Sequence, residues 1–150
     1  FSVFSEEKSW SKRLKNKELF FKKICKFFPK KYKFPQKKVS FTILLSNNKN
    51  IRRLNKLFRD KNKSTDILSF PANKKQKMVK EIYIGDIIIN YNFIDKPKSQ
   101  SSKIFKEKLI KIFIHGFLHL LNFDHIKDKD YIKMLKEEEL IYKSVISKLY

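Results

Sequence analysis

The chain has 150 residues, of which 36 are lysine or arginine and 15 are aspartate or glutamate, so its net charge is +21. Hydrophobic residues make up 41% of it and aromatic residues 15%, which excludes a disordered chain and suits a single domain over residues 1–150. No stretch approaches the roughly 20 uninterrupted apolar residues of a membrane span, so we expect no membrane partner.

Alternating and helical patterns of apolar residues predict four elements in the first half of the chain. They are a short strand over Phe1–Ser5, a helix over Trp10–Phe28 ended by Pro29, a strand over Val39–Leu45, and a helix capped by Asn48 or Asn50 and running to about Phe58. A basic loop over Lys30–Lys38 separates the first helix from the second strand. The inward side chains expected for the later helix are Ile51, Leu54, Leu57 and Phe58.

The second half begins with strands and loops and ends with two helices. In chain order we predict a polar turn over Asp60–Ser64, a strand over Thr65–Phe70 closed by Pro71, a basic loop over Asn73–Lys80, a strand over Glu81–Asn90 broken at Gly85-Asp86, and a loop over Tyr91–Ser102. A helix over about Lys103–Leu121 follows, and its second half is apolar nearly all round, which indicates burial. The last helix is expected over Lys129–Leu149, with an inward stripe of Tyr131, Leu135, Glu138, Tyr142, Val145 and Leu149.

The high positive charge has two interpretations. It draws the protein toward polyanions such as nucleic acid, or it reflects compositional drift, because 32 of the 36 basic residues are lysine. If arginine drifts to lysine easily in this chain, a remaining arginine is of interest for its planar, bidentate fork. The four arginines are Arg13, Arg52, Arg53 and Arg59.

The single cysteine, Cys25, cannot form an internal disulfide, which favours a reducing, cytoplasmic location. Thiol catalysis by Cys25 is disfavoured because a lone cysteine on an apolar helix face usually fills the core. The chain begins at Phe1 rather than Met, so a missing native start and a targeting segment stay open.

All three histidines fall within the segment HGFLHLLNFDH, at positions 115, 119 and 125. His115 and His119 are four residues apart, so on a helix they share one face and can share one metal ion. His125 reaches the same ion only if the helix stops and the chain turns back. Asn122 suits that turn, because asparagine tolerates the left-handed conformation that ends helices. The spacing predicts one Zn²⁺ per chain, held by His115, His119 and His125.

Three imidazole ligands with an open fourth position are typical of a catalytic zinc site, where bound water reaches a pKa of about 7. A structural site is normally closed by a fourth ligand, which Asp124 or another carboxylate can in principle supply. The alternative is that the histidines are core residues satisfied by backbone groups. Two unpaired imidazoles on a buried helix would cost about 1–3 kcal/mol each, so we favour the metal.

The same histidine spacing occurs in metzincin proteases, which carry a glutamate after the first histidine as general base. This chain has Gly116 at that position, which argues against peptide hydrolysis. A glycine inside a helix costs about 1 kcal/mol relative to alanine, so Gly116 is expected to allow close approach of another backbone or of substrate.

Several motifs together resemble the YbeY family of bacterial endoribonucleases, which act in 16S rRNA maturation and ribosome quality control. The motifs are Leu54-Asn55 with Phe58-Arg59, TDILSFP from Thr65 to Pro71, Gly85-Asp86-Ile87, and the histidine segment. The resemblance spans nearly the whole chain. The family pattern has glycine in place of Asn122 and usually tyrosine in place of Phe58 and Phe123, and none of these three is a ligand.

The resemblance implies an α+β fold, a small mixed sheet of about four strands packed by helices, with a buried helix carrying the metal-binding histidines. It implies that His115, His119 and His125 bind zinc and that Arg59 is an essential residue of the cleft, where its fork suits phosphate and transition-state charge. Asp66 and Asp86 are candidates for supporting the metal ligands or lining the cleft, with turn or capping roles as the alternative. Glu138 is expected to pair with a lysine, an arginine or a histidine ring edge, and the sequence names no general base.

The function expected from this resemblance is that of a zinc-dependent, single-strand-specific endoribonuclease in 16S rRNA 3′ end maturation and ribosome quality control. Its partners would be rRNA and the small ribosomal subunit. Two alternatives stay open: a non-catalytic ribosome assembly factor with structural zinc, and a metallopeptidase.

Overall fold

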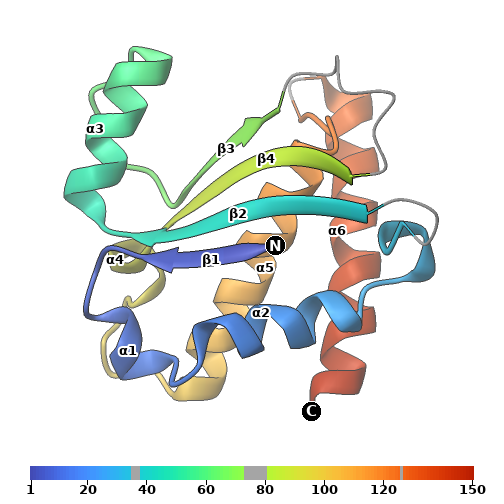
Figure 1. Cartoon of the computed structure of the whole chain (residues 1–150), viewed down its shortest axis with the longest axis horizontal. Helices are drawn as coiled ribbons and strands as arrows, with labels where there is room; N and C mark the ends of the chain where they lie inside the picture. Colours follow the sequence, from blue (N-terminus) through green and yellow to red (C-terminus); the bar gives the residue numbers. More distant parts are fainter. Residues whose placement is uncertain (35–37, 73–80, 126) are drawn as a thin grey trace.

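Figure 1 shows the computed structural model of the chain, which describes residues 1–34, 38–72, 81–125 and 127–150. The predicted basic loop Asn73–Lys80 lies outside the described residues. In chain order the elements are β1 (Ser2–Ser5), α1 (Trp10–Arg13), α2 (Lys17–Lys26), the 3-10 turn η1 (Lys30–Tyr32), β2 (Lys38–Ser46), α3 (Asn48–Arg59), β3 (Ile67–Pro71), β4 (Glu81–Asn90), α4 (Tyr91–Ile94), α5 (Ser102–Leu120) and α6 (Asp128–Leu149).

The four strands form one mixed sheet in the order β1-β2-β4-β3. β1, β2 and β4 run parallel, and β3 pairs antiparallel with β4 at the edge of the sheet. The predicted α+β fold with a mixed sheet of about four strands is confirmed.

β4 is continuous where the sequence predicted a break at Gly85-Asp86. Ser40 pairs with Tyr83 and Thr42 with Asp86, so β4 carries one extra residue there, a β-bulge. Gly85 has a φ of +136°, and a Cβ on it would collide with the carbonyl oxygen of Phe70 on β3. The bulge therefore requires glycine, and the strand bends without ending.

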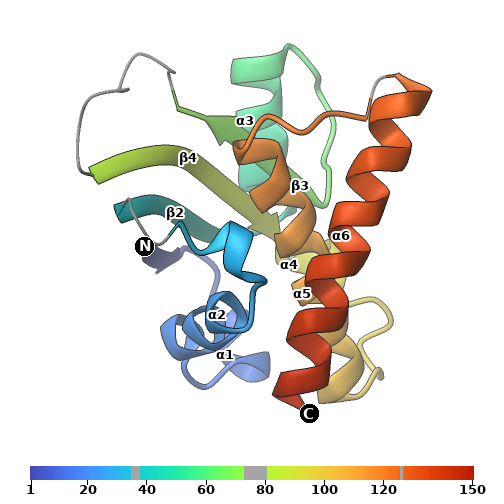
Figure 2. The same cartoon turned by 90° about the vertical axis from the view of Figure 1, so that its right-hand side faces the viewer.

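The two faces of the sheet are covered unequally. The large core lies on the face covered by α5, where Ile87 and Ile89 of β4 pack with the buried side chains of α2, α5 and α6. On the opposite face, Ile88 and Leu68 form a small cluster with Ile51 and Leu54 of α3 and with Leu44 and Phe70 of the sheet. Figure 1 draws α3 apart from the other long helices, and Figure 2 shows α5 and α6 next to each other. The histidine-bearing helix is thus enclosed in the main core.

Phenylalanine rings hold α5 in that core. The ring of Phe117 lies 5.1 Å from that of Phe28 and 5.7 Å from that of Phe41, and Phe113 lies 5.1 Å from Phe21. The predicted burial of this helix is confirmed. None of the helices among the described residues is both long and apolar enough to cross a membrane.

The predicted helix over Trp10–Phe28 is wrong in one respect, because the chain forms two helices there. α1 ends after Arg13, and α2 begins at Lys17 because the Asn16 side chain caps it by accepting from the Leu19 N–H.

The cap of α3 is also one residue earlier than predicted, since the Asn47 side chain accepts from the Asn50 N–H. The predicted loop over Tyr91–Ser102 contains the short helix α4 and the start of α5.

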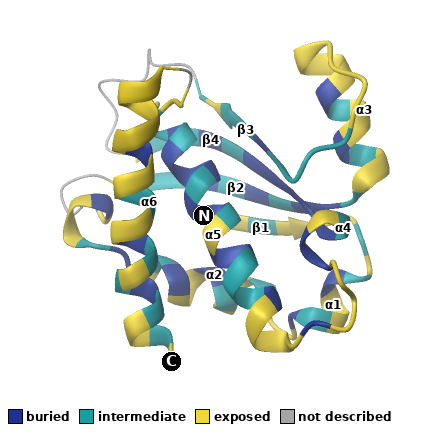
Figure 3. Ribbon diagram, turned by 180° about the vertical axis from the view of Figure 1, so that it is seen from behind, coloured by how far each residue is buried: buried dark blue, intermediate teal, exposed yellow. Residues whose placement is uncertain are grey.

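Two predicted inward stripes were partly wrong. In α3, Ile51 is buried, but Leu57 and Phe58 are 69% and 63% exposed because the last turn of this helix has no second layer to pack against. In α6, Met134, Ile141 and Val145 are buried, while Tyr131 and Leu135 are 52% and 43% exposed. Figure 3 shows the outer face of α6 exposed along much of its length.

Candidate metal centre

The end of α5 brings the third histidine back toward the first two. His115 and His119 lie on the last two turns of the helix. Asn122 then adopts a left-handed conformation with φ of 70°, and the Asn122 and Phe123 N–H groups donate to the carbonyl oxygens of His119 and Leu118 at 2.9 and 3.0 Å. This closes the helix as the sequence predicted for Asn122 and returns the chain to His125.

The three imidazoles form one compact cluster. One ring nitrogen from each of His115, His119 and His125 lies within 4.8 Å of the others. The Nε2 atoms of His115 and His119 are 3.0 Å apart, and the ring of His125 lies 5.6 and 5.2 Å from theirs, centroid to centroid. The predicted clustering of the three histidines on and beside a buried helix is confirmed.

The outer nitrogens of the first two rings are anchored. His115 Nδ1 lies 2.5 Å from Oε1 of Glu138 on α6, and His119 Nδ1 lies 2.9 Å from the carbonyl oxygen of Phe123. Both partners are acceptors, so each ring carries its proton on Nδ1 and presents an Nε2 lone pair to the other. Two lone pairs 3.0 Å apart repel each other unless a cation lies between them. The donor set therefore fits a metal ion, and a carboxylate or carbonyl behind each histidine is the usual support for such ligands.

Electrostatics favour the ligand form of His119. Burial, and then the neighbouring His115, hold the pKa of His119 below its ordinary value. A neutral imidazole is the form that binds a metal ion, so His119 is ready to act as a ligand at neutral pH.

The cluster offers three ligands and leaves further coordination open. Among the described residues, no thiolate or carboxylate joins the group of three histidines, and residues 35–37, 73–80 and 126 contain no His, Cys, Asp or Glu. The Asp124 carboxylate accepts from the backbone N–H of His125 at 2.7 Å. Three nitrogen ligands with an open position are the arrangement of catalytic rather than structural zinc sites.

Gly116 lets α5 lie directly against the sheet. A Cβ at this position would lie 2.5 Å from Cδ1 of Ile67 and 3.1 Å from Oγ of Ser69, both on β3. The Ser69 hydroxyl donates to the Gly116 carbonyl oxygen at 3.1 Å. The predicted close approach is found, but the predicted partner is wrong, because side chains of the sheet and not a backbone or a substrate lie against Gly116. There is no room for the glutamate that a metzincin protease carries here.

The family model described as endoribonuclease YbeY matches residues 4–146 of the chain. The chain belongs to the YbeY family. The endoribonuclease YbeY of Pelagibacter ubique is 60% identical to it over 147 residues, which cover 98% of this chain and 96% of the relative. That of Neorickettsia sennetsu is 31% identical over 136 residues, 91% of this chain and 90% of the relative. A Thermotoga maritima protein known from its solution structure is 24% identical with a TM-score of 0.61, over 99% of this chain and 91% of that one, which shows a shared fold.

The other predicted site residues of this YbeY-family chain, Arg59 from the resemblance and Asp66 and Asp86 from the sequence, do not belong to the group of three histidines. Arg59 is the exposed last residue of α3, the helix on the sheet face opposite α5. Asp66 precedes β3, where its side chain accepts from the Thr65 hydroxyl and its carbonyl oxygen accepts from the Asn90 N–H. Asp86 accepts from the Tyr83 hydroxyl and pairs with Phe70 in the sheet, on the α3 side.

Glu138 is the residue that the structure adds to the YbeY histidine cluster. The sequence placed it on an inward stripe and left lysine, arginine and a histidine ring edge as its partners; the structure selects the ring of His115. The inward position was a usable signal, but the partner lies on another helix and cannot be read from α6 alone.

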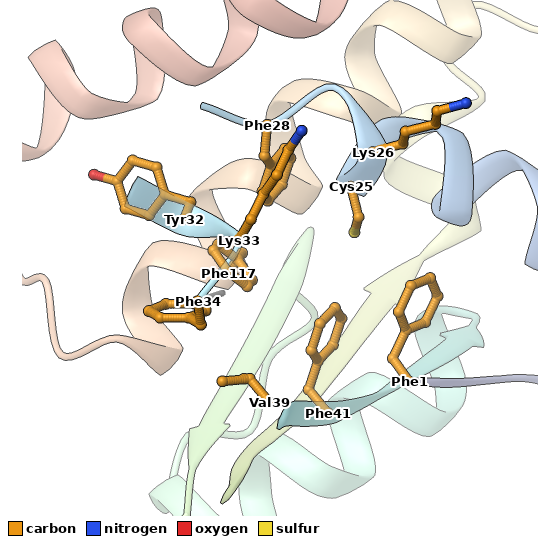
Figure 4. A pocket seen from close by; sticks show the side chains of 10 residues that line it. All are labelled: Phe1, Cys25, Lys26, Phe28, Tyr32, Lys33, Phe34, Val39, Phe41 and Phe117. Atoms are coloured by element: carbon orange, nitrogen blue, oxygen red, sulfur yellow. The ribbon is translucent and has the colours of Figure 1, made fainter. Parts of the chain in front are cut away.

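Of the hollows formed by the described residues, one borders the histidine cluster and one borders Cys25. One of about 260 Å³ borders the cluster and is lined by His115, His125, Tyr131, Met134, Leu135 and Glu138. Another of about 280 Å³ lies between the start of the chain, α2 and β2, and Figure 4 shows Cys25 pointing into it toward the rings of Phe1 and Phe41. Burial raises the pKa of Cys25 to about 12, so its thiol is not a nucleophile at neutral pH.

Proposed function

We propose that this YbeY-family chain is a single-domain, zinc-dependent endoribonuclease that cuts single-stranded RNA in 16S rRNA 3′ end maturation and ribosome quality control. Its partners would then be rRNA and the small ribosomal subunit, and its compartment the cytoplasm. The observation that carries the proposal is the pair of anchored histidines, His115 and His119, whose Nε2 atoms converge with a nitrogen of His125. The endoribonuclease description of the family supports RNA as the substrate.

The chain's own groups define how the centre would work. His115, His119 and His125 would hold one Zn²⁺, which when bound lowers the pKa of a water molecule to about 7 and polarises a phosphoryl oxygen. Glu138 and the Phe123 carbonyl fix the ring orientations of His115 and His119, so these two ligands are oriented for the ion before it binds. The opening beside His115 and His125 leaves a side of the cluster accessible to a phosphodiester.

Arg59 is proposed to bind the RNA backbone. Its guanidinium is exposed at the end of α3 and suits bidentate contact with a phosphate, where it can stabilise charge that develops during cleavage. Because α3 and α5 lie on opposite faces of the sheet and β3 is an edge strand, the β3 edge is a route by which one RNA strand can touch both. Asp66 and Asp86 are then cleft-ordering residues: the Asp66 carbonyl oxygen accepts from the Asn90 N–H of β4, and the Asp86 carboxylate accepts from the Tyr83 hydroxyl of its own strand.

Electrostatics agree with a polyanionic substrate. A net charge of +21 raises the rate of encounter with RNA and contributes phosphate contacts that are independent of base sequence.

Each alternative function conflicts with one feature of the site. A structural zinc in an assembly factor requires a fourth protein ligand, which the described cluster lacks. A metzincin-type peptidase requires a glutamate at position 116, where Ile67 and Ser69 occupy the space.

The experiment pairs zinc content with cleavage of a single-stranded 16S rRNA fragment, for the wild type and His119→Ala purified identically. About one zinc per chain in the wild type, with cleavage lost in the variant, supports the proposal. Zinc without cleavage by either protein selects the assembly factor. If the wild type contains no bound metal, the assignment of the three histidines as a metal site is overturned.

A further inference from the structure

Part of α6 presents apolar side chains to the histidine cluster, and of these only Met134 also belongs to the core. Tyr131, Met134, Leu135 and Glu138 follow the spacing i, i+3, i+4, i+7, so they form one stripe on the helix. Met134 is 1% exposed, yet Tyr131 and Leu135 are 52% and 43% exposed although they lie on this stripe. Large apolar groups left open beside a candidate active site call for a partner.

These side chains line the hollow of about 260 Å³ that also borders His115 and His125. The volume falls below the usual 300–1,000 Å³ of sites for drug-sized ligands, so it suits one planar group rather than a longer segment. A ligand in this hollow would be adjacent to any group held by the three histidines.

We propose that this hollow is a nucleobase subsite that takes the base next to the phosphodiester at the histidines, with Tyr131 and Leu135 contacting its faces. The proposal rests on the proposed function, because it takes RNA as the substrate. Aromatic stacking is the usual means by which proteins bind unpaired bases, and a base stacked in a duplex cannot enter such a hollow. The subsite would therefore contribute to selection of single strands.

The polar lining predicts little discrimination among bases. Oε1 of Glu138 is directed at His115 Nδ1, and the ring nitrogens of His115 and His125 belong to the metal cluster. Tyr131, Met134 and Leu135 then supply the remaining walls, and stacking on such walls tolerates every base. The net charge of +21 attracts phosphates and does not bind a base. The electrostatic and the stacking contributions to RNA affinity can therefore be measured separately.

The test uses a short, fluorescein-labelled single-stranded RNA in which one abasic ribose is moved along the strand. Binding to the wild type, Tyr131→Ala, Tyr131→Phe and Ile132→Ala is measured by fluorescence anisotropy at one fixed salt concentration, with gels to confirm intact RNA. Ile132 is the matched control, because it is 55% exposed on the same helix and does not line the hollow. Cleavage of the complete RNA by the wild type is recorded in parallel.

At one abasic position the wild type should lose about 5- to 150-fold in affinity, the range known for base–aromatic stacking. Tyr131→Ala should lose a similar factor on the complete RNA and little more on that abasic RNA, while Tyr131→Phe and Ile132→Ala behave as wild type. If Tyr131→Ala binds every RNA as tightly as Ile132→Ala does, the subsite is overturned, even when the wild type cleaves. If the affinity losses of Tyr131→Ala and of one abasic position overlap in this way but the wild type does not cleave the RNA, the subsite is supported and the endonuclease is rejected.

Discussion

His115 Nδ1 and Glu138 Oε1 lie 2.5 Å apart, although the two residues belong to different helices, α5 and α6. The contact links the packing of these helices to the orientation of a metal ligand. Because the carboxylate accepts the Nδ1 proton, it keeps His115 Nε2 free for the ion and raises the basicity of the ring. Loss of this partner should weaken the metal site without unfolding the chain.

We predict that Glu138→Ala lowers zinc affinity about 10- to 100-fold, measured by competition with a chromophoric chelator. Glu138→Gln keeps an oxygen acceptor and should lose less. Glu139→Ala is the control, because Glu139 is exposed and pairs only with Lys143 among the described residues. Equal zinc affinity for Glu138→Ala and Glu139→Ala would contradict the supporting role.

Gly116→Ala should destabilise the protein although alanine is the better helix former. The added Cβ would lie 2.5 Å from Ile67 Cδ1, and such overpacking costs about 1–3 kcal/mol against a helix gain of about 1 kcal/mol. Urea unfolding measures the difference. Ile67→Val removes the colliding methyl group, so Gly116→Ala should cost less in that background. An identical cost in both backgrounds would show that contact with Ile67 is not the cause.

Asn122 is predicted to tolerate glycine and to reject valine. Its φ of 70° lies in the left-handed region, which costs most non-glycine residues roughly 1–2 kcal/mol and β-branched residues more. Asn122→Val should therefore lower both the free energy of unfolding and the zinc affinity, since His125 follows this turn. Asn122→Gly should preserve both. Urea unfolding with and without chelator separates the effect on stability from the effect on zinc binding. Unchanged zinc binding in Asn122→Val would show that this turn does not position His125 for the metal.

The sequence predicted local features well where one segment determines them. The histidine spacing and Asn122 sufficed to predict the cluster, because a helix and its terminating turn fix three positions within one segment. The mixed sheet followed from alternating strands and from the family resemblance. The break between α1 and α2 was missed because Trp10, Leu14 and Phe21 continue one apolar pattern across the Asn16 cap.

Features that depend on which element packs on which were not predictable from one segment. Periodicity alone put Leu57, Phe58, Tyr131 and Leu135 inward, but α3 has no second layer over its last turn and α6 borders a hollow. The placement of Arg59 and Asp86 on the opposite sheet face from α5 depends on sheet order and on the β4 bulge, which no local motif encodes.

Acidic pH should destabilise the metal-free protein through His119. Burial, followed by the charge of His115, lowers the pKa of His119 in the folded state below its ordinary 6.5, so the unfolded chain binds the proton more tightly. Stability is then lost as pH falls below about 6.5 and through the folded pKa. Urea unfolding in chelator between pH 7.5 and pH 5 should show a shallower decline for His119→Gln than for the wild type. Parallel declines would exclude this contribution.

Arg59→Lys should reduce RNA cleavage while zinc content stays unchanged. Lysine keeps the charge but loses the planar fork that contacts two phosphate oxygens, and loss of a group that stabilises transition-state charge costs about 10²–10³ in rate. Arg53→Lys is the matched control, because Arg53 is exposed on the same helix. Because Arg59 lies across the sheet from the histidines, a contact with a phosphate beyond the cleaved one would raise KM, whereas a contact at the reacting phosphate would lower kcat. If Arg59→Lys cleaves RNA at the same rate as Arg53→Lys, Arg59 has no role in cleavage. The histidine cluster would then be the part of the proposed active site that remains.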